Sequence, residues 1–123
     1  MHAIFLALSL LLSSTNIFPM QSIKCLLLIQ GYKHKRAFIV AEGPMQSTVR
    51  NFWKMIYERN CAVVVMTSAL IEEGQEASAQ YWPDSGIAHY GEFAVDLLGE
   101  EKLQGFMIRN LSVMDTKVCD ALV

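Results

Sequence analysis

The sequence predicts one small domain of the α/β class, in the broad sense that includes α+β, with a mixed sheet and one main covering helix. Two apolar runs rich in β-forming residues, at 37–41 and 61–67, indicate buried strands, and an amphipathic segment at 47–59 lies between them. A strand, a helix and a strand within about thirty residues favour a sheet with a helix packed on it. The length of 123 residues suits a single domain.

The helix expected at 47–59 has one apolar face. Ser47 or Thr48 is expected to cap its first free N–H groups. Aromatic residues at helical spacing belong to a core far more often than to a ligand site. The apolar residues that fall at i, i+3, i+4 and i+7 of one stripe are Val49, Phe52, Trp53 and Ile56.

The other regular elements are expected to be strands. Gly43 and Pro44 end the first strand, and the run of valines in 61–67 disfavours a helix there. Turn signals at 83–86 and 99–105 separate three more candidates, which are expected to form an antiparallel meander. These candidates lie around 79–82, around 92–97 and at 106–113.

Residues 1–30 differ in character from the rest, and two explanations stay open. The apolar run at 4–12, broken only by Ser9, is followed by small residues, as in a secretory signal peptide, and is too short to span a membrane. The region before this run is poor in positive charge, with His2 as the one candidate. The segment is therefore expected to be signal-like or non-native, such as the product of a mis-joined exon.

Composition and motifs exclude several classes of function. The formal net charge of −2 implies no basic face for a nucleic acid. The 3 cysteines are odd in number and no pair has CxxC spacing, so neither a disulfide framework nor a zinc site is suggested. The phosphate-loop, dinucleotide, serine-hydrolase and zinc-protease motifs do not occur. We expect no metal, no cofactor and no nucleic-acid partner.

Two blocks of the sequence resemble the tyrosine-specific protein phosphatases. AFIVAEGPMQSTVRNFWKMIYER resembles that family's A-F-I-x-A-Q-G-P-x-x-x-T-x-x-x-F-W-x-M-I-x-E, and VVVMTSALIEEGQEASAQYWPDSGIAHYGEF looks like its block ending in Q-Y-W-P-x-x-G-x-x-x-Y-G. FMIRNLSV fits the strand that follows. The match runs over 31–117, and 118–123 form a divergent tail. The motif residues are Phe52, Trp53, Gln80, Tyr81, Trp82, Pro83, Tyr90 and Gly91.

The resemblance implies a partial tyrosine-phosphatase fold of receptor type, most similar to the second, membrane-distal domain of a tandem pair. The family hydrolyses phosphotyrosine in proteins without metal, through a cysteinyl-phosphate intermediate. A cysteine thiolate in a His-Cys-x5-Arg loop attacks phosphorus and an aspartate protonates the leaving tyrosine. The implied partners are phosphotyrosine proteins or a partner phosphatase domain in the parent protein. The parent is expected at the plasma membrane, with its phosphatase domain in the cytoplasm.

The catalytic parts that the resemblance requires are missing from this sequence, so no catalytic residue is expected. No Cys is followed six residues later by Arg, and the sequence stops before the acid loop is due. Ala77 and Ser78 stand where active members usually carry Lys and Cys, which indicates a weak or silent domain. We expect an inactive fragment with unpaired strands and exposed apolar faces. An active phosphatase of which this is an incomplete part, and a secreted or membrane-associated non-enzymatic α/β interaction module, stay as alternatives.

Two acidic positions need separate interpretation. A Trp-Pro-Asp triplet can deliver a general acid, but the resemblance places this one at an upstream strand end, where Trp82 packs in the core, Pro83 ends the ladder and Asp84 serves a turn with Gly86. Glu72 matches the loop carboxylate that helps orient the phosphate-binding arginine. Because it lies among other acidic residues, a solvated loop stays the alternative for it.

Overall fold

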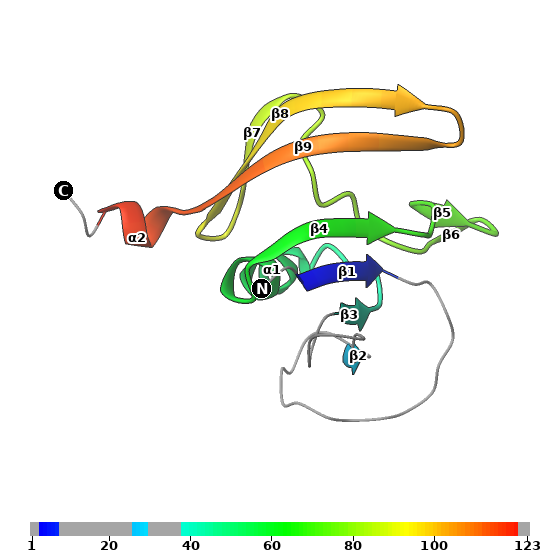
Figure 1. Ribbon diagram of the computed structural model, residues 1–123, viewed down its shortest axis with the longest axis horizontal. Coiled ribbons are helices and arrows are strands. Elements are labelled where there is room, and N and C mark those ends of the chain that lie inside the picture. The colour runs from blue at the N-terminus through cyan, green and yellow to red at the C-terminus, as the bar shows by residue number, and fades with distance from the viewer. Residues whose placement is uncertain (1–2, 8–25, 30–37, 121–123) are drawn as a thin grey trace. The chain divides into compact units, whose positions relative to one another are not determined.

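A computed structural model describes residues 3–7, 26–29 and 38–120, with side chains described from 38 to 119. The chain divides into two compact units, Met1–Ala79 and Gln80–Val123, which are described separately. Figure 1 follows the elements along the chain. In the described part of the chain, no helix is both long and apolar enough to cross a membrane.

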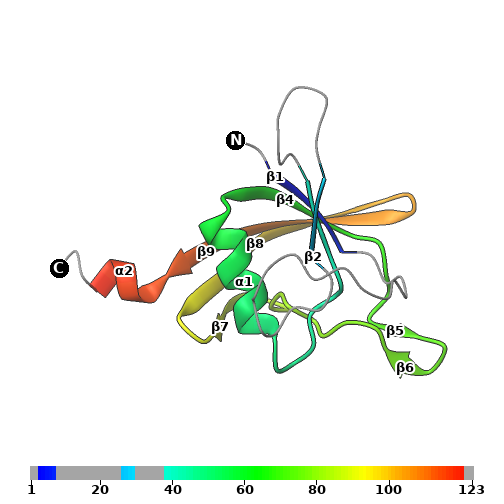
Figure 2. The same cartoon turned by 90° about the horizontal axis from the view of Figure 1, so that it is seen from below.

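The first unit contains a four-stranded mixed sheet, as predicted. Its strands in spatial order are β2 (Leu26–Ile29), β3 (Phe38–Ala41), β1 (Ala3–Ala7) and β4 (Cys61–Met66) (Figure 1). β2 runs antiparallel to β3, while β1 is parallel to both of its neighbours. The helix α1 (Val49–Glu58) connects β3 to β4 and contacts β4, so the expected covering helix is confirmed (Figure 2). β3 and β4 are not adjacent, because β1 pairs with both.

The N-terminal segment contributes two of these strands. Ala3–Ala7 forms β1 and Leu26–Ile29 forms β2, while the remainder of residues 1–30 lies outside the described residues. Periodicity could not distinguish these roles, because a short apolar run has the same composition in a signal peptide and in a buried strand. The signal-like or non-native origin of this segment stays a prediction.

The apolar stripe of α1 is buried as predicted, and its aromatic pair is almost fully enclosed. Phe52 and Trp53 are each 1% exposed, and their rings meet edge to face with centroids 5.7 Å apart. Such a pair contributes about 0.5–1.5 kcal/mol beyond the apolar area that it buries. The buried residues of α1 are Val49, Phe52, Trp53, Met55 and Ile56.

The helix begins differently from the prediction. Thr48 occupies the N-cap position, but its side chain makes no capping hydrogen bond to the helix. Its hydroxyl instead accepts a hydrogen bond from the Met45 N–H at 2.9 Å and donates to the Met45 carbonyl at 3.3 Å. Thr48 therefore closes the turn that precedes α1, because its backbone already lies in the helical region, at φ −117° and ψ 0°.

A close backbone contact joins the loop after β3 to the end of the first unit. The Ala79 N–H donates to the Pro44 carbonyl at 2.7 Å, and the buried Ser78 hydroxyl donates to the Ala79 carbonyl at 2.9 Å. A Cβ atom built on Gly43 would lie 2.8 Å from the Ser78 Cβ and 2.9 Å from its Oγ. Gly43 is therefore required for close approach as well as for ending β3.

The acidic loop after β4 contains a small hairpin. β5 (Ile71–Glu72) pairs antiparallel with β6 (Gln75–Glu76). The two residues between them, Glu73 and Gly74, both have positive φ, at 51° and 77°. This is the backbone of a type I′ turn, in which glycine is favoured.

The second unit is an antiparallel meander in the order β7 (Gly86–Tyr90), β8 (Phe93–Leu103) and β9 (Phe106–Asp115), followed by the short helix α2 (Thr116–Asp120). The predicted architecture is confirmed, but its first member is wrong: residues 79–82 form no strand, and β7 takes that place. Pro83 has no N–H group to donate to a strand ladder. The two residues between Tyr90 and Phe93, of which Gly91 has a φ of 65°, form the turn of the β7–β8 hairpin.

The β8–β9 hairpin is longer than predicted. The turn expected over 99–105 is confined to the two residues between Leu103 and Phe106, where Gly105 has a φ of 93°. Gly99 lies inside β8, next to a register shift that follows Leu97. A glycine in a strand can mark a bulge instead of a turn, which is why the sequence signal was misleading.

We expect Gly43→Ala to lower the free energy of unfolding by about 1–3 kcal/mol, because the new methyl group overlaps the Ser78 side chain. Urea unfolding followed by tryptophan fluorescence measures this. Gly99→Ala is the matched control, since its Cβ would meet nothing within 4 Å, and its effect should stay within about 0.5 kcal/mol. Equal midpoints for Gly43→Ala and the parent chain would contradict the close-approach argument.

Trp53→Ala should remove about 3–5 kcal/mol, because it empties the centre of a buried aromatic pair. That loss is comparable with the whole stability of a small domain, so the cooperative unfolding transition should disappear. Lys54→Ala is the comparison on the same helix, because its ion pair with Glu58 spans 3.8 Å between largely exposed side chains. A cooperative transition of unchanged midpoint in Trp53→Ala would refute the assignment of this residue to the core.

Candidate functional site

The motif residues from the sequence fall into two groups. Phe52 and Trp53 belong to α1 in the first unit, where both are buried. The other six lie at or after the start of the second unit, around the loop that leads into β7 and the turn that follows it. These six are Gln80, Tyr81, Trp82, Pro83, Tyr90 and Gly91.

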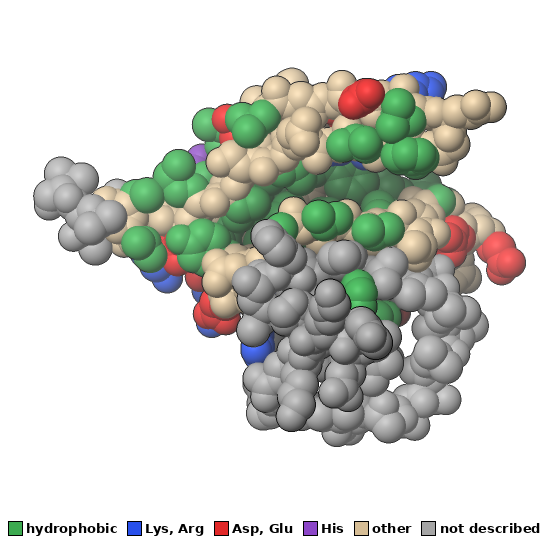
Figure 3. Space-filling model, viewed as in Figure 1, with side chains coloured by type: hydrophobic (Ala, Val, Ile, Leu, Met, Phe, Trp, Pro, Cys, Tyr) green, Lys and Arg blue, Asp and Glu red, His purple; other side chains and the backbone are tan. Residues whose placement is uncertain are grey.

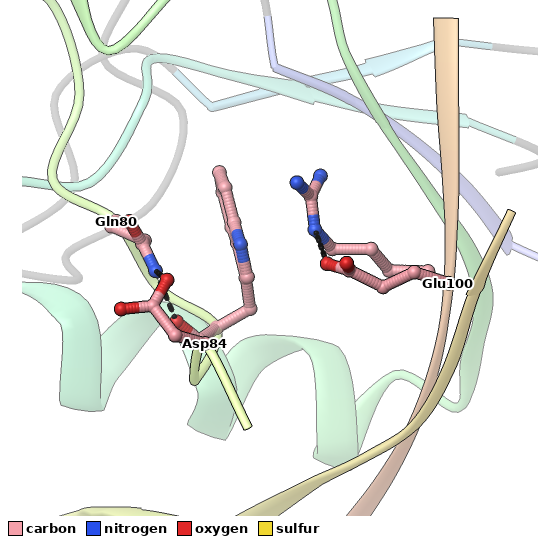
Figure 4. A network of polar contacts seen from close by, with 5 residues as sticks. Gln80, Asp84 and Glu100 are labelled. Atoms are coloured by element: carbon pink, nitrogen blue, oxygen red, sulfur yellow. Dashed lines mark hydrogen bonds and ion pairs between the residues drawn. The ribbon is translucent and has the colours of Figure 1, made fainter. Parts of the chain in front are cut away.

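The Trp-Pro-Asp loop is held by the Gln80 side chain. Its Nε2 atom donates to the Trp82 carbonyl at 3.0 Å and to the Asp84 Oδ1 at 2.8 Å. Figure 4 shows Gln80 and Asp84 facing one another across this loop. The Asp84 carboxylate thus supports the local backbone and lies just before Gly86, whose φ is 62°. These contacts agree with the turn interpretation of Asp84.

Trp82 does not lie in the core, contrary to the prediction. The Trp82 side chain is half-buried, and the residue lies outside any strand. The prediction that Pro83 ends a strand at this point is therefore also wrong. One ring contact is with Tyr81, edge to face, at a centroid distance of 4.9 Å. The guanidinium carbon of Arg109, from β9, lies 4.5 Å from the centroid of the Trp82 ring. A cation–π contact of this kind contributes about 0.5–2 kcal/mol, depending on its exposure.

Arg109 was missed by the sequence argument. Its Nε donates to the Glu100 Oε1 at 2.8 Å across the β8–β9 hairpin, and Figure 4 shows this ion pair at Glu100. The side chains of Arg109 and Glu100 are 29% and 39% exposed. In the sequence, Arg109 is the single charged residue of the run FMIRNLSV. This pattern cannot reveal that its aromatic partner, Trp82, lies 27 positions earlier.

Two tyrosines in this unit have raised pKa values. Burial raises the pKa of Tyr81 to about 12, and the positive charge of Arg109 partly opposes the shift. The pKa of Tyr90 is also raised, first by burial and then by the Asp84 carboxylate. Both shifts stabilise the neutral phenol relative to the phenolate.

Glu72 lies at the end of β5. Its Oε1 accepts a hydrogen bond from the Ala69 N–H at 3.1 Å, which closes the loop between β4 and β5. The side chain is exposed, as a solvated loop requires. The role of orienting a phosphate-binding arginine stays a prediction.

The described cysteines do not have the surroundings of an activated nucleophile. Cys61 begins β4 and is half-buried. Burial raises the pKa of its thiol, and the nearby charge of Arg59 only partly opposes this. An activated thiolate requires the opposite shift. Cys119 is exposed in α2, and among the described residues no cluster of three or more His, Cys, Asp or Glu is placed to bind a metal.

The buried phenol of Tyr81 gives a pH prediction. Because its folded-state pKa lies near 12, above the unfolded value, its contribution to stability is complete below pH 10 and is lost as pH rises through 12. Absorbance titration at high pH should show a tyrosine that ionises near pH 12 and that Tyr81→Phe removes. Arg109→Gln should move that ionisation to still higher pH, and a shift to lower pH would contradict the arrangement.

The comparisons with known proteins agree with this description. The family described as protein-tyrosine phosphatase matches residues 27–121. Receptor-type tyrosine-protein phosphatase alpha of Homo sapiens is 40% identical over 89 residues, which cover 72% of this chain and 11% of that protein. Receptor-type tyrosine-protein phosphatase zeta of Rattus norvegicus is 39% identical over 90 residues, covering 73% and 4%. Tyrosine-protein phosphatase Lar of Drosophila melanogaster is 36% identical over 89 residues, covering 72% and 4%.

The chain therefore spans 11% or less of the length of these relatives. The matched region nevertheless includes α1, both units' motif residues and the whole meander. On this match over most of its length, the chain belongs to the protein-tyrosine phosphatase family, as part of a domain like those of the receptor-type members.

Proposed function

We propose that this polypeptide is scaffold from a receptor-type phosphatase domain and does not hydrolyse phosphotyrosine by itself. The observation that carries the proposal is chemical. The sequence contains no Cys followed six residues later by Arg, and the thiol of Cys61 has a raised pKa. Cleavage of a phosphate ester through a cysteinyl intermediate needs a thiolate, a cradle for the phosphate oxygens and a proton donor.

The surroundings of Asp84 support the same conclusion. A general acid must reach the leaving oxygen of the substrate. The Asp84 carboxylate is hydrogen-bonded to Gln80 within its own loop, and neither Cys61 nor Cys119 belongs to that loop. We therefore assign Asp84 to structure and not to proton transfer.

A weak or silent parent domain is the second part of the proposal. Ala77 cannot supply the charge of the lysine expected at this position, and Ser78 is 2% exposed with its hydroxyl bonded to backbone carbonyls. Both residues are compatible with the fold, so their chemistry and not their packing separates this chain from active members. This favours the second, membrane-distal domain of a tandem pair, in a parent protein at the plasma membrane.

The retained role is then one of interaction. A domain without a nucleophile can still contact a partner phosphatase domain or a phosphotyrosine protein through its folded surface. The alternative is a secreted or membrane-associated interaction module, which the apolar run at 4–12 favours. Recovery of the chain from the medium with a newly cleaved N-terminus would support the alternative.

The purified 123-residue chain should release no phosphate from a phosphotyrosine peptide above the buffer rate. Two variants accompany it: Cys61→Ser, and a chain in which all 3 cysteines are replaced by serine. Phosphate release by the parent chain that disappears in either variant would refute the proposal. Release that persists without any cysteine comes from a contaminating phosphatase, and subtracting it leaves the expected zero.

A further inference from the structure

Strand β1 lies between two strands that the chain itself connects through α1. β3 leads into α1 and α1 leads into β4, yet the sheet leaves one strand position between β3 and β4, and β1 fills it (Figure 1). The residues of β1, Ala3–Ala7, precede the segment that the phosphatase family matches, which begins at residue 27. A position inside the sheet, between two strands of the family match, is thus held by a segment from outside that match.

From Ile4 onward, β1 pairs with both of its neighbours in one uninterrupted register. Residues 4–7 lie opposite 38–41 of β3 and 63–66 of β4, and both ladders are parallel. A strand with a neighbour on each side uses backbone N–H and C=O groups on both of its edges. Without β1, the facing edges of β3 and β4 would lose these partners, and each buried polar group left without one costs about 1–3 kcal/mol. The position therefore favours an extended peptide that pairs on both edges.

The sequence of β1 suits this position. AIFLA contains no charged residue, no Gly and no Pro, so no residue interrupts the ladders. The strands on either side are also apolar, with FIVA in β3 and CAVVVM in β4, and Ile39 and Ala41 of β3 are buried. Strands inside parallel sheets are characteristically continuous apolar runs. The pattern therefore indicates an apolar occupant.

We propose that the position between β3 and β4 is a binding site for an extended apolar peptide, and that residues 3–7 are its tethered occupant in this chain. Binding follows the mode of strand addition, in which backbone hydrogen bonds provide the affinity. Because the occupant belongs to the same chain, its high effective concentration keeps a free peptide out. The inference concerns pairing within the first unit, so it does not depend on whether the chain is catalytically silent.

A disulfide tests the occupant and its register in the full chain. In a background with the 3 native cysteines replaced by serine, Leu6→Cys and Val65→Cys place thiols on two paired residues. Paired Cα atoms of neighbouring strands lie about 4.8 Å apart, which a disulfide spans. We expect a cross-linked monomer under mild oxidation. Leu6→Cys with Val63→Cys is the matched control, because a two-residue offset increases the separation to roughly 8 Å, which a disulfide does not span.

The two valines are comparable positions for cysteine. Val63 and Val65 are 49% and 38% exposed, so either replacement removes little buried area, and Figure 3 shows hydrophobic side chains at the surface where β4 runs. Equal cross-linking of the two pairs, no cross-link in the paired one, or a disulfide that joins two copies would overturn the proposal.

Phe5→Pro tests whether the site accepts a peptide that is not tethered. Proline removes one N–H group from the ladder and is not tolerated in the middle of a sheet, so the N-terminal segment should release the position. A fluorescent peptide of residues 2–8, HAIFLAL, should then bind this variant at least about tenfold more tightly than the parent chain, whose site is already occupied. Fluorescence anisotropy measures the difference. Matched peptides that carry Phe5→Pro or Leu6→Lys should not bind.

Peptide binding of equal strength to both chains, or binding of the matched peptides, would contradict the proposal. Failure of the peptide to bind a folded Phe5→Pro chain would contradict it as well. Where that variant has lost its fold, the disulfide pair decides, because it keeps the backbone of β1 unchanged.

Discussion

Burial of the apolar stripe on α1 is the constraint on which the first unit depends. An isolated helix of ten residues is marginal in water, so α1 exists because packing stabilises it. α1 also connects, along the chain, two strands that the sheet does not place side by side, since it follows β3 and precedes β4. The close contact between Gly43 and Ser78 then ties the loop before α1 to the end of the unit. Removing the aromatic pair would leave the sheet without its cover.

The second unit is held mainly by local hydrogen bonds and by one stacked ion pair. Its strands follow one another along the chain, with two-residue turns, so little loop-closure entropy is lost. Its most deeply buried apolar side chains include Phe93, Val95 and Tyr81, which are 2%, 0% and 4% exposed. Arg109 completes this arrangement by covering Trp82 while Glu100 neutralises its charge. In the loop that resembles a catalytic Trp-Pro-Asp sequence, the Gln80 side chain donates to the Trp82 carbonyl and to the Asp84 carboxylate.

The proposed absence of catalysis rests on a separation of fold from chemistry. Every motif residue that we could place contributes to packing, turns or hydrogen bonds, and none activates a nucleophile. A phosphatase nucleophile depends on a lowered cysteine pKa, whereas burial at the start of β4 has the opposite effect on Cys61.

The sequence by itself determined the local elements whose patterns are unambiguous. The i, i+3, i+4, i+7 stripe of α1, the valine-rich β4 and the resemblance carried by FW and QYWP were sufficient for the helix, the strand and the family. Local patterns could not decide whether Gly99 marks a turn or a bulge, because a glycine satisfies either. Tertiary structure decided the surroundings of Trp82. Its ring is half-buried and contacts the guanidinium of Arg109 from β9. Contacts between residues far apart in sequence leave no periodic signal, and for that physical reason only the folded chain could reveal them.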